Sequence, residues 1–273
     1  MAKTAAMNQK ISKKRADQLV CEQGLTVSRE QAKRLIMAGE VQILPEEGSR
    51  ALPVRVDKPG QLLRSTVQLA LTGKEQYVSR GAYKLLTILE SASLDVTGFV
   101  CLDAGASTGG FTDLLLQRGA SRVYAVDVGH NQLHEKLRAD SRVVSMEGVN
   151  LRTAEPGLIP EQVDLVVADV SFISLTLVLE PCMTWLKKGG WVAALVKPQF
   201  ELGPGQTDRG VVRSEELRRQ AVDKVVTFAR ETLGLDVLSV VPAAIKGPKG
   251  NQEYLALMRR PQRSMAAPLT APE

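Results

Sequence analysis

Hydrophobic and polar residues follow two different patterns along this chain, and the change falls near Val78. Before Val78, short apolar groups are separated by Gly and Pro, which is typical of brief helices and strands. Ser28 and Gln31 have the spacing of a capping box, and Gly24 stands where a glycine commonly ends a helix. We therefore expect a small α+β unit over residues 13–71. Its expected elements are helices at 13–23 and 28–39 and strands at 41–44 and 52–56.

From Val78 onward, apolar runs of strand length alternate with longer segments of helical periodicity. This alternation predicts a parallel sheet with helices on both faces. Residues 242–253 carry no helical pattern, so the strand that follows them is expected to run antiparallel. The predicted fold class is α/β, a Rossmann-like and mostly parallel seven-stranded sheet over residues 78–260. The expected strands are 99–102, 122–126, 143–146, 163–168, 191–196, 237–241 and 254–258, and the expected helices are 81–92, 111–117, 132–139, 174–186 and 214–232.

The remaining segments are polar or rich in Pro and Ala. We expect a mobile tail at 1–12, a linker at 72–77 and a disordered tail at 261–273. No apolar stretch approaches the roughly 18 residues that span a bilayer, and the basic N-terminus lacks the apolar centre of a signal peptide. The three cysteines lie far apart and are odd in number, which is usual in a reducing compartment. These features predict a cytoplasmic protein with no membrane partner.

Charge is unevenly distributed, although the whole chain carries a net charge of only +5. Residues 1–80 hold 14 Lys or Arg against 8 Asp or Glu, whereas the rest of the chain holds 21 against 22. A basic module in front of a near-neutral body favours a polyanionic partner such as nucleic acid. The alternative is an ordinary solvated surface.

The strongest motif is a glycine-rich segment at 103–111, Asp-Ala-Gly-Ala-Ser-Thr-Gly-Gly-Phe, between an expected strand and an expected helix. Such a loop places backbone N–H groups at the carboxyl edge of the sheet, where α/β proteins bind ligands. Its spacing is not the GxGxxG of dinucleotide folds, and it is not a P-loop because no Lys-Ser/Thr follows. The segment therefore predicts a site for a nucleoside without a phosphate chain. The alternative is a tight strand-to-helix turn without a ligand.

Two carboxylates flank this loop. Asp127 ends the next strand, about 20 residues beyond Gly105, where an acid can accept hydrogen bonds from ribose hydroxyls. Asp103 precedes the loop and could meet the amino group or the sulfonium of S-adenosylmethionine (SAM). SAM is one nucleoside that such a site could bind, and the family resemblance given below implies it as the cofactor. The candidate cofactor residues are Asp103, Gly105, Ser107, Thr108, Gly109, Gly110, Phe111, Asp127 and Asp169.

Two further signals point to different chemistry. Residues 105–109 read Gly-Ala-Ser-Thr-Gly, the pattern of a hydrolase nucleophile elbow, but no histidine follows the later strands to act as base. His130 and His134 are spaced so that they could hold a metal ion on one helix face. No Cys or carboxylate cluster of recognisable spacing completes that site. We therefore expect neither a hydrolase nor a metal centre.

Five sequence blocks over residues 78–260 resemble the FtsJ-type SAM-dependent RNA 2′-O-methyltransferases. Residues 13–70 are similar to the S4 RNA-binding domain, with Arg15-Ala-Asp17 in place of the usual Arg-Leu-Asp. The combination resembles the TlyA, or hemolysin A, family, whose members methylate ribosomal RNA. The resemblance therefore implies a ribosomal RNA 2′-O-methyltransferase of the cytidine type. The five blocks are 79–85, 103–113, 168–175, 196–201 and 246–253.

The resemblance also assigns a Lys-Asp-Lys-Glu catalytic tetrad to Lys84, Asp169, Lys197 and Glu253. An amine can take a proton from a ribose hydroxyl only when it is itself neutral, and a second lysine nearby disfavours the ammonium form. Lys197 is then the general base or the group that orients the hydroxyl, with Lys84 tuning its charge. Asp169 and Glu253 would orient the two amines. The alternative is a pair of structural ion pairs at the sheet edge.

The expected partner is ribosomal RNA or a ribosomal subunit, bound by a monomer. A 2′-hydroxyl reaches a deep pocket only if the RNA is locally distorted or the nucleotide is flipped out. Three other functions stay open: an assembly factor that binds SAM without transfer, a membrane-lysing hemolysin, and a small-molecule methyltransferase. The candidate RNA-binding residues are Arg15, Arg29, Lys33, Arg34, Ser79, Arg80 and Arg209.

Overall fold

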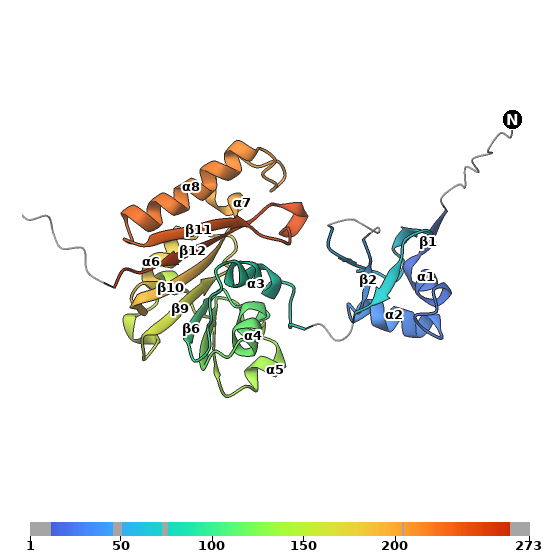
Figure 1. Ribbon diagram of the computed structural model, residues 1–273, viewed down its shortest axis with the longest axis horizontal. Helices are drawn as coiled ribbons and strands as arrows, with labels where there is room; N and C mark the ends of the chain where they lie inside the picture. Colours follow the sequence, from blue (N-terminus) through green and yellow to red (C-terminus); the bar gives the residue numbers. More distant parts are fainter. Residues whose placement is uncertain (1–11, 46–50, 73–75, 204, 263–273) are drawn as a thin grey trace, which may run out of the picture. The chain divides into compact units, whose positions relative to one another are not determined.

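The computed structural model describes residues 12–45, 51–72, 76–203 and 205–262. The chain divides into two compact units, Met1–Gln76 and Tyr77–Glu273, which are drawn in Figure 1. Most of the two expected tails, and the centre of the expected linker, lie outside the described residues.

The described part of the first unit contains two helices and short antiparallel strands around one apolar core. Its helices are α1 (Ala16–Glu22) and α2 (Arg29–Met37). The Ser28 hydroxyl accepts the Gln31 N–H at 3.2 Å, so the expected cap of α2 is confirmed. Leu19, Val20 and Ile36 from the two helices pack in this core. The strands are β1 (Lys13–Arg15), β2 (Val41–Ile43), β3 (Val54–Arg55), β4 (Leu62–Arg64) and β5 (Leu69–Leu71).

One expected element of this unit is wrong at its start. The helix predicted from residue 13 begins at Ala16, because Lys13–Arg15 forms strand β1 and pairs antiparallel with β4. The partner strand lies about fifty residues later in the chain, so the local pattern of polar and apolar residues did not indicate it. The other three short strands form a separate sheet in the order β3-β2-β5.

The second unit is built on one sheet of seven strands within the described residues, in the order β11-β12-β10-β9-β6-β7-β8. Strand β12 is antiparallel to both of its neighbours, and the other pairings are parallel. The predicted mostly parallel sheet with an antiparallel last strand is therefore confirmed. The strands are β6 (Val100–Ala104), β7 (Arg122–Asp127), β8 (Val143–Glu147), β9 (Val163–Ala168), β10 (Leu186–Val196), β11 (Asp236–Pro242) and β12 (Tyr254–Arg259).

Helices cover both faces of this sheet (Figure 1). On β9, Leu165 and Val167 join the core beneath α3 and α4, whereas Val166 and Ala168 join the core beneath α6 and α8. The alternation follows from the period of two in a strand. It confirms the prediction of a sheet buried on both sides. The helices are α3 (Ala82–Ser91), α4 (Gly110–Gln117), α5 (Glu135–Arg138), α6 (Thr176–Cys182), α7 (Pro198–Glu201) and α8 (Glu215–Glu231).

Two expected helices are shorter than predicted. The helix expected at 132–139 is reduced to α5, because the Glu147 carboxylate accepts the N–H groups of residues 131–133 at 2.7–3.1 Å. The helix expected at 174–186 ends at Cys182, since Leu186 already pairs with Val163 as the first residue of β10. Among the described residues, no helix is both long enough and apolar enough to span a bilayer.

Candidate functional site

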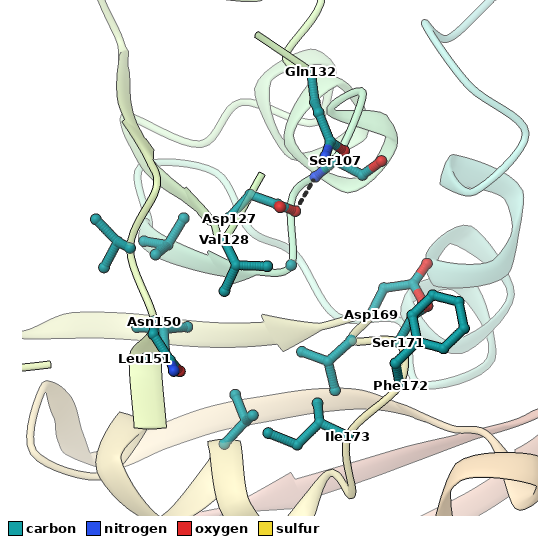
Figure 2. Close-up of a pocket in the computed structure, with 15 residues that line it drawn as sticks. Ser107, Asp127, Val128, Gln132, Asn150, Leu151, Asp169, Ser171, Phe172 and Ile173 are labelled. Carbon is teal, nitrogen blue, oxygen red and sulfur yellow. Dashed lines mark hydrogen bonds between the residues drawn. The ribbon is translucent and has the colours of Figure 1, made fainter. Parts of the chain in front are cut away.

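Two adjoining cavities open at the carboxyl ends of β6, β7 and β9. The larger has a volume of about 360 Å³ and the smaller about 160 Å³. Gly105, Ser107, Asp169 and Ser171 line both, so the two form one continuous site. Figure 2 shows the larger cavity, with Asp127 and Asp169 on different sides of it. This is the sheet edge where the sequence predicted a ligand.

The glycine loop between β6 and α4 is shaped by close contacts with the protein itself. Gly105 has a φ of +84°, and a Cβ there would lie 2.9 Å from the backbone oxygen of Asp169. A Cβ on Gly110 would meet the Ser79 hydroxyl and would come within 3.1 Å of the Ala82 nitrogen. The first-turn N–H groups of α4 have no partner inside the helix and therefore favour a polar or anionic group at this end. The glycines allow the loop to approach β9 and α3 closely.

Asp127 joins the ends of β6 and β7. Its carboxylate accepts the N–H of Ser107 at 2.8 Å, drawn dashed in Figure 2, and the N–H of Gly129 at 2.7 Å. Each carboxylate oxygen has a second lone pair, so the group can still accept a hydroxyl from a ligand. Val128 and Leu151 supply apolar surface in the same cavity. A polar acceptor beside apolar walls suits a nucleoside.

Asp103 lies at the base of the smaller cavity and is fully buried. The Thr112 hydroxyl donates to its Oδ2 atom at 2.7 Å, whereas Oδ1 has no hydrogen-bond partner among the described residues. Burial raises the pKa of Asp103 to about 7, although the hydrogen bond from Thr112 favours the ionised form. A buried carboxylate that lines a cavity and has one unpaired oxygen is suited to a cationic ligand.

The four residues of the expected tetrad come together as two ion pairs. Lys197 Nζ lies 2.6 Å from Asp169 Oδ1 and also donates to the Ser171 hydroxyl at 2.8 Å. Lys84 Nζ donates to Glu253 Oε2 at 2.7 Å. The Lys197 side chain is only 9% exposed and lines the smaller cavity. The pair formed by Lys197 and Asp169 therefore borders the space where a ligand would bind.

The two ion pairs are joined by their neighbours. Gln199 follows Lys197 by two residues and donates to Glu253 Oε1 at 3.3 Å. On the other side, a Cβ on Gly81, just before α3, would lie 4.0 Å from Asp169 Oδ2. Helix α3 carries Lys84, so this helix and the ends of β9 and β10 meet at one place. The arrangement presents two amines and two carboxylates at the sheet edge.

Several residues of the site were not singled out from the sequence, among them Val128 and Leu151 on the cavity wall, and also Phe172 and Glu201. Phe172 has a φ of +65°, is 91% exposed and lies 5.1 Å from Phe200 between ring centroids. Glu201 is buried and accepts the Ser174 hydroxyl at 2.6 Å and the Leu175 N–H at 2.7 Å. Glu201 thus holds the loop after β9 against α7. An aromatic residue after Asp169 was visible in the sequence, but its exposure was not.

The expected RNA-binding residues have different surroundings. Arg15 and Arg29 both donate to the buried carboxylate of Asp17, at 2.9–3.1 Å. The hydrogen bond from Arg15, with a further one from Arg29, lowers the pKa of Asp17 to about 2. Both arginine side chains are nonetheless about half exposed, so each can still contact a phosphate. Lys33 forms an ion pair with Glu30. Ser79 lines the smaller cavity. The remaining three candidates are exposed: Arg34, Arg80 and Arg209.

The two histidines do not share a helix face. His134 precedes α5 and its ring nitrogen accepts the Lys136 N–H at 3.2 Å, whereas His130 lies in the loop after β7. Across the described part of the chain, no three His, Cys, Asp or Glu side chains are grouped as they would be around a metal ion.

Comparisons with known proteins agree on one family. The FtsJ-like methyltransferase family matches residues 77–260. The 16S/23S rRNA (cytidine-2′-O)-methyltransferase TlyA of Mycobacterium tuberculosis is 44% identical, over 90% of this chain and 89% of that protein. Hemolysin A of Brachyspira hyodysenteriae is 37% identical, over 89% and 98%. A solved Streptococcus thermophilus structure, described as a candidate hemolysin, is 44% identical with a TM-score of 0.69, covering 92% of this chain and 90% of that one.

Proposed function

This chain belongs to the FtsJ-like methyltransferase family, with relatives among the TlyA (hemolysin A) proteins, and we propose that it methylates ribose 2′-hydroxyls of ribosomal RNA with SAM. The observation that carries the proposal is the ion pair between Lys197 and Asp169 on the wall of the smaller cavity. It puts an amine beside the space that a methyl donor would occupy. The TlyA relatives act on cytidine, which is the base we expect here.

The residues of the two cavities fit SAM. The larger cavity has the carboxylate of Asp127 for ribose hydroxyls and the apolar side chains of Val128 and Leu151 for adenine. The smaller cavity has Asp103, with its unpaired Oδ1, for the positive charge of the methionine part. Gly105 belongs to both cavities and can accept a cofactor close to its backbone. When bound there, SAM supplies a methyl group already activated by its sulfonium.

The tetrad residues then act on the ribose. Lys197 contacts the 2′-hydroxyl, and either accepts its proton or holds it in line for attack on the methyl carbon. Asp169 and the Ser171 hydroxyl fix the position of the Lys197 amine through contacts of 2.6 and 2.8 Å. Lys84, held by Glu253, adds a second positive charge at the sheet edge. This charge would attract a nearby phosphate of the RNA.

RNA would contact both units. Phe172 presents an exposed ring one residue after Ser171, where a base displaced from its stack could lie against it. In the first unit, Arg15, Arg29 and Arg34 offer exposed guanidinium groups to phosphates. Such an S4-like unit would supply affinity without determining the chemistry. Action on ribosomal RNA would place the protein in the cytoplasm.

The test is methyl transfer to RNA in vitro. The purified protein is incubated with methyl-labelled SAM and unmodified ribosomal subunits, and the RNA is digested to nucleosides. We expect label in 2′-O-methylcytidine. A protein that binds SAM and ribosomal RNA but transfers no label would instead be a binding factor, and label in base methyl groups would contradict the assigned chemistry.

A further inference from the structure

We infer that Glu201 is a positioning residue for methyl transfer, because its buried carboxylate holds the segment after β9 that keeps the Lys197 amine in place. The inference rests on the proposed function and names a further residue on which the chemical step depends. Glu201 lies outside the residues that line the two cavities. It acts through Ser171, whose hydroxyl accepts a hydrogen bond from Lys197 Nζ at 2.8 Å.

The two segments concerned leave the same edge of the sheet, because they follow the neighbouring parallel strands β9 and β10. They are residues 169–175 and residues 197–201, and the second contains α7. Sheet pairing of the described residues ends at Ala168 in β9 and at Val196 in β10. Contacts between the two segments must therefore fix how they lie against each other.

Two contacts near the sheet join these segments. Lys197 Nζ lies 2.6 Å from Asp169 Oδ1 and donates to the Ser171 hydroxyl. Farther from the strand ends, the rings of Phe172 and Phe200 lie 5.1 Å apart between centroids. Figure 2 shows Asp169, Ser171 and Phe172 along one side of the larger cavity. A shift of this segment would therefore move the hydroxyl that holds Lys197.

Glu201 makes the outermost contact, and its side chain is only 2% exposed. Its Oε2 atom accepts the Ser174 hydroxyl at 2.6 Å, and its Oε1 atom accepts the Leu175 N–H at 2.7 Å. Lys224 on α8 supplies the counter-charge, with Nζ 3.3 Å from Oε2 and 2.8 Å from the backbone oxygen of Glu201. Hydrogen bonds to an ionised carboxylate are stronger than neutral ones. Glu201 thus fastens the far end of the segment to α7 and α8.

The backbone of the segment shows why it needs this contact. Phe172 has a φ of +65°, a left-handed conformation that a bulky residue keeps only when its surroundings hold it. Its side chain is 91% exposed, so burial of the ring does little to hold it. Ser171 lies on one side of Phe172, and the partners of Glu201 lie on the other. Without the Glu201 carboxylate, the strained residue can relax and carry Ser171 away from Lys197.

The test is single-turnover methyl transfer by the Glu201→Gln variant at saturating SAM and RNA. Glutamine has nearly the same volume, but only one of its two terminal atoms accepts hydrogen bonds. Ser174 and Leu175 then no longer have an acceptor each. We expect the rate to fall about 10- to 100-fold, the usual cost of a small misplacement in an active site.

Asp164→Asn is the matched control. Asp164 lies near the start of β9, at the opposite edge of the sheet. Its carboxylate also accepts one backbone N–H, that of Val100 at 2.9 Å, and also pairs with one lysine, Lys187 at 2.6 Å. This variant should lower the temperature of thermal unfolding but transfer methyl groups at the parent rate. An equal loss of rate in both variants would overturn the inference.

A double-mutant cycle tests the route from Glu201 to Lys197. Ser171→Ala removes the hydroxyl that accepts from Lys197, so it should slow methyl transfer by itself. Adding Glu201→Gln to Ser171→Ala should slow transfer by no more than about twofold further, because residues that act through one contact are not additive. Two effects that multiply in the double variant would show that Glu201 does not act through Ser171.

Hydrogen exchange tests the hold on the segment without any methyl transfer. The amides of residues 171–175 should exchange faster in Glu201→Gln than in the parent, and at the parent rate in Asp164→Asn. Equal exchange in all three proteins would overturn the inference, as would a transfer rate in Glu201→Gln within twofold of the parent. A parent protein that transfers no methyl groups would instead contradict the proposed function, and exchange would still decide whether Glu201 holds this segment.

Discussion

Asp17 in the first unit and Asp103 in the second are both buried within polar clusters, and the two clusters differ in how completely the carboxylate is paired. Asp17 in the first unit accepts hydrogen bonds from Arg15 and Arg29, and its pKa is lowered to about 2. Asp103 in the second unit accepts the Thr112 hydroxyl on one oxygen only, and its pKa is raised to about 7. Both side chains are fully buried.

This difference distinguishes a polar cluster that stabilises the fold from a polar cluster that can bind a ligand. Asp17 has its counter-charges within the fold, so its negative charge stabilises the folded unit. Asp103 lines a cavity and has no counter-charge within the fold, so a cationic ligand bound there would supply one. The pair formed by Lys197 and Asp169 also faces that cavity. Changes at Lys197 should therefore affect the rate of methyl transfer, loss of the Asp103 charge should stabilise the protein without cofactor, and loss of the Asp17 charge should destabilise the first unit.

The largest effect is expected at Lys197. Replacing it by alanine should reduce single-turnover methyl transfer by about 100- to 10,000-fold, the usual contribution of a positioned acid or base. Affinity for S-adenosylhomocysteine and for RNA should change little. Lys197→Arg keeps the positive charge but cannot accept a proton, so it separates the two roles given to this residue. If the Lys197→Arg variant transfers methyl groups within a few-fold of the parent rate, Lys197 orients the hydroxyl and does not accept its proton.

The second largest effect is expected in the stability of the protein without cofactor, which should depend on pH through Asp103. A raised carboxyl pKa means that the folded state holds its proton more tightly than the unfolded state does. Stability should therefore fall as pH rises from about 4 to 7, by up to roughly 4 kcal/mol for a shift from 3.8 to about 7. Asp103→Asn should remove this loss. Thermal unfolding of both proteins from pH 5 to 8, without cofactor, measures it, and parallel curves would contradict the assignment.

At Asp17 we expect the opposite pH dependence of stability, with a smaller change in the free energy of unfolding. Its lowered pKa contributes stability that is present above about pH 4 and is lost as pH falls toward 2, roughly 2 kcal/mol in all. Asp17→Asn should lose this contribution at neutral pH. Hydrogen exchange of α1 and α2 in the full chain is the appropriate measurement, because it reports on the first unit alone. If α1 and α2 in the variant are protected from exchange as well as in the parent, the ion pairs of Asp17 with the two arginines contribute little stability.

The smallest effect is expected at Phe172. If a displaced base stacks on this ring, Phe172→Ala should raise the KM for RNA by about tenfold, within the usual range for base–aromatic stacking. Phe172→Tyr keeps an aromatic face and should stay close to the parent. Cofactor affinity serves as the control. Equal KM values for the alanine and tyrosine variants would remove Phe172 from RNA binding.

The fold of the second unit could be predicted because its strands are continuous apolar runs of strand length. The errors arose where distant residues decide local structure. Lys13–Arg15 is a strand because of β4, and residues 131–133 leave the helix because Glu147 takes their N–H groups. Such contacts bring together residues that are far apart in the chain. The local pattern of hydrophobic and polar residues therefore does not predict them.

The candidate site shows the same limit. The glycine loop, Asp103 and Asp127 could be placed at the sheet edge from the order of elements alone. The hydrogen-bond partners of the two carboxylates could not be predicted. They depend on side chains such as Thr112 and on which carboxylate oxygen each donor reaches. The anchoring of Arg15 and Arg29 on Asp17 was likewise invisible in the sequence, since spacing shows charge but not its partner.

Whether this site methylates ribosomal RNA can be measured by mapping ribose methylation in ribosomal RNA from cells of the source organism. Mass spectrometry would compare cells that carry the parent gene, a deletion, and a chromosomal Lys197→Ala variant. We expect at least one 2′-O-methylcytidine that is present with the parent gene and absent in the other two. Identical ribose methylation in all three would contradict the assignment of this site to methyl transfer on ribosomal RNA.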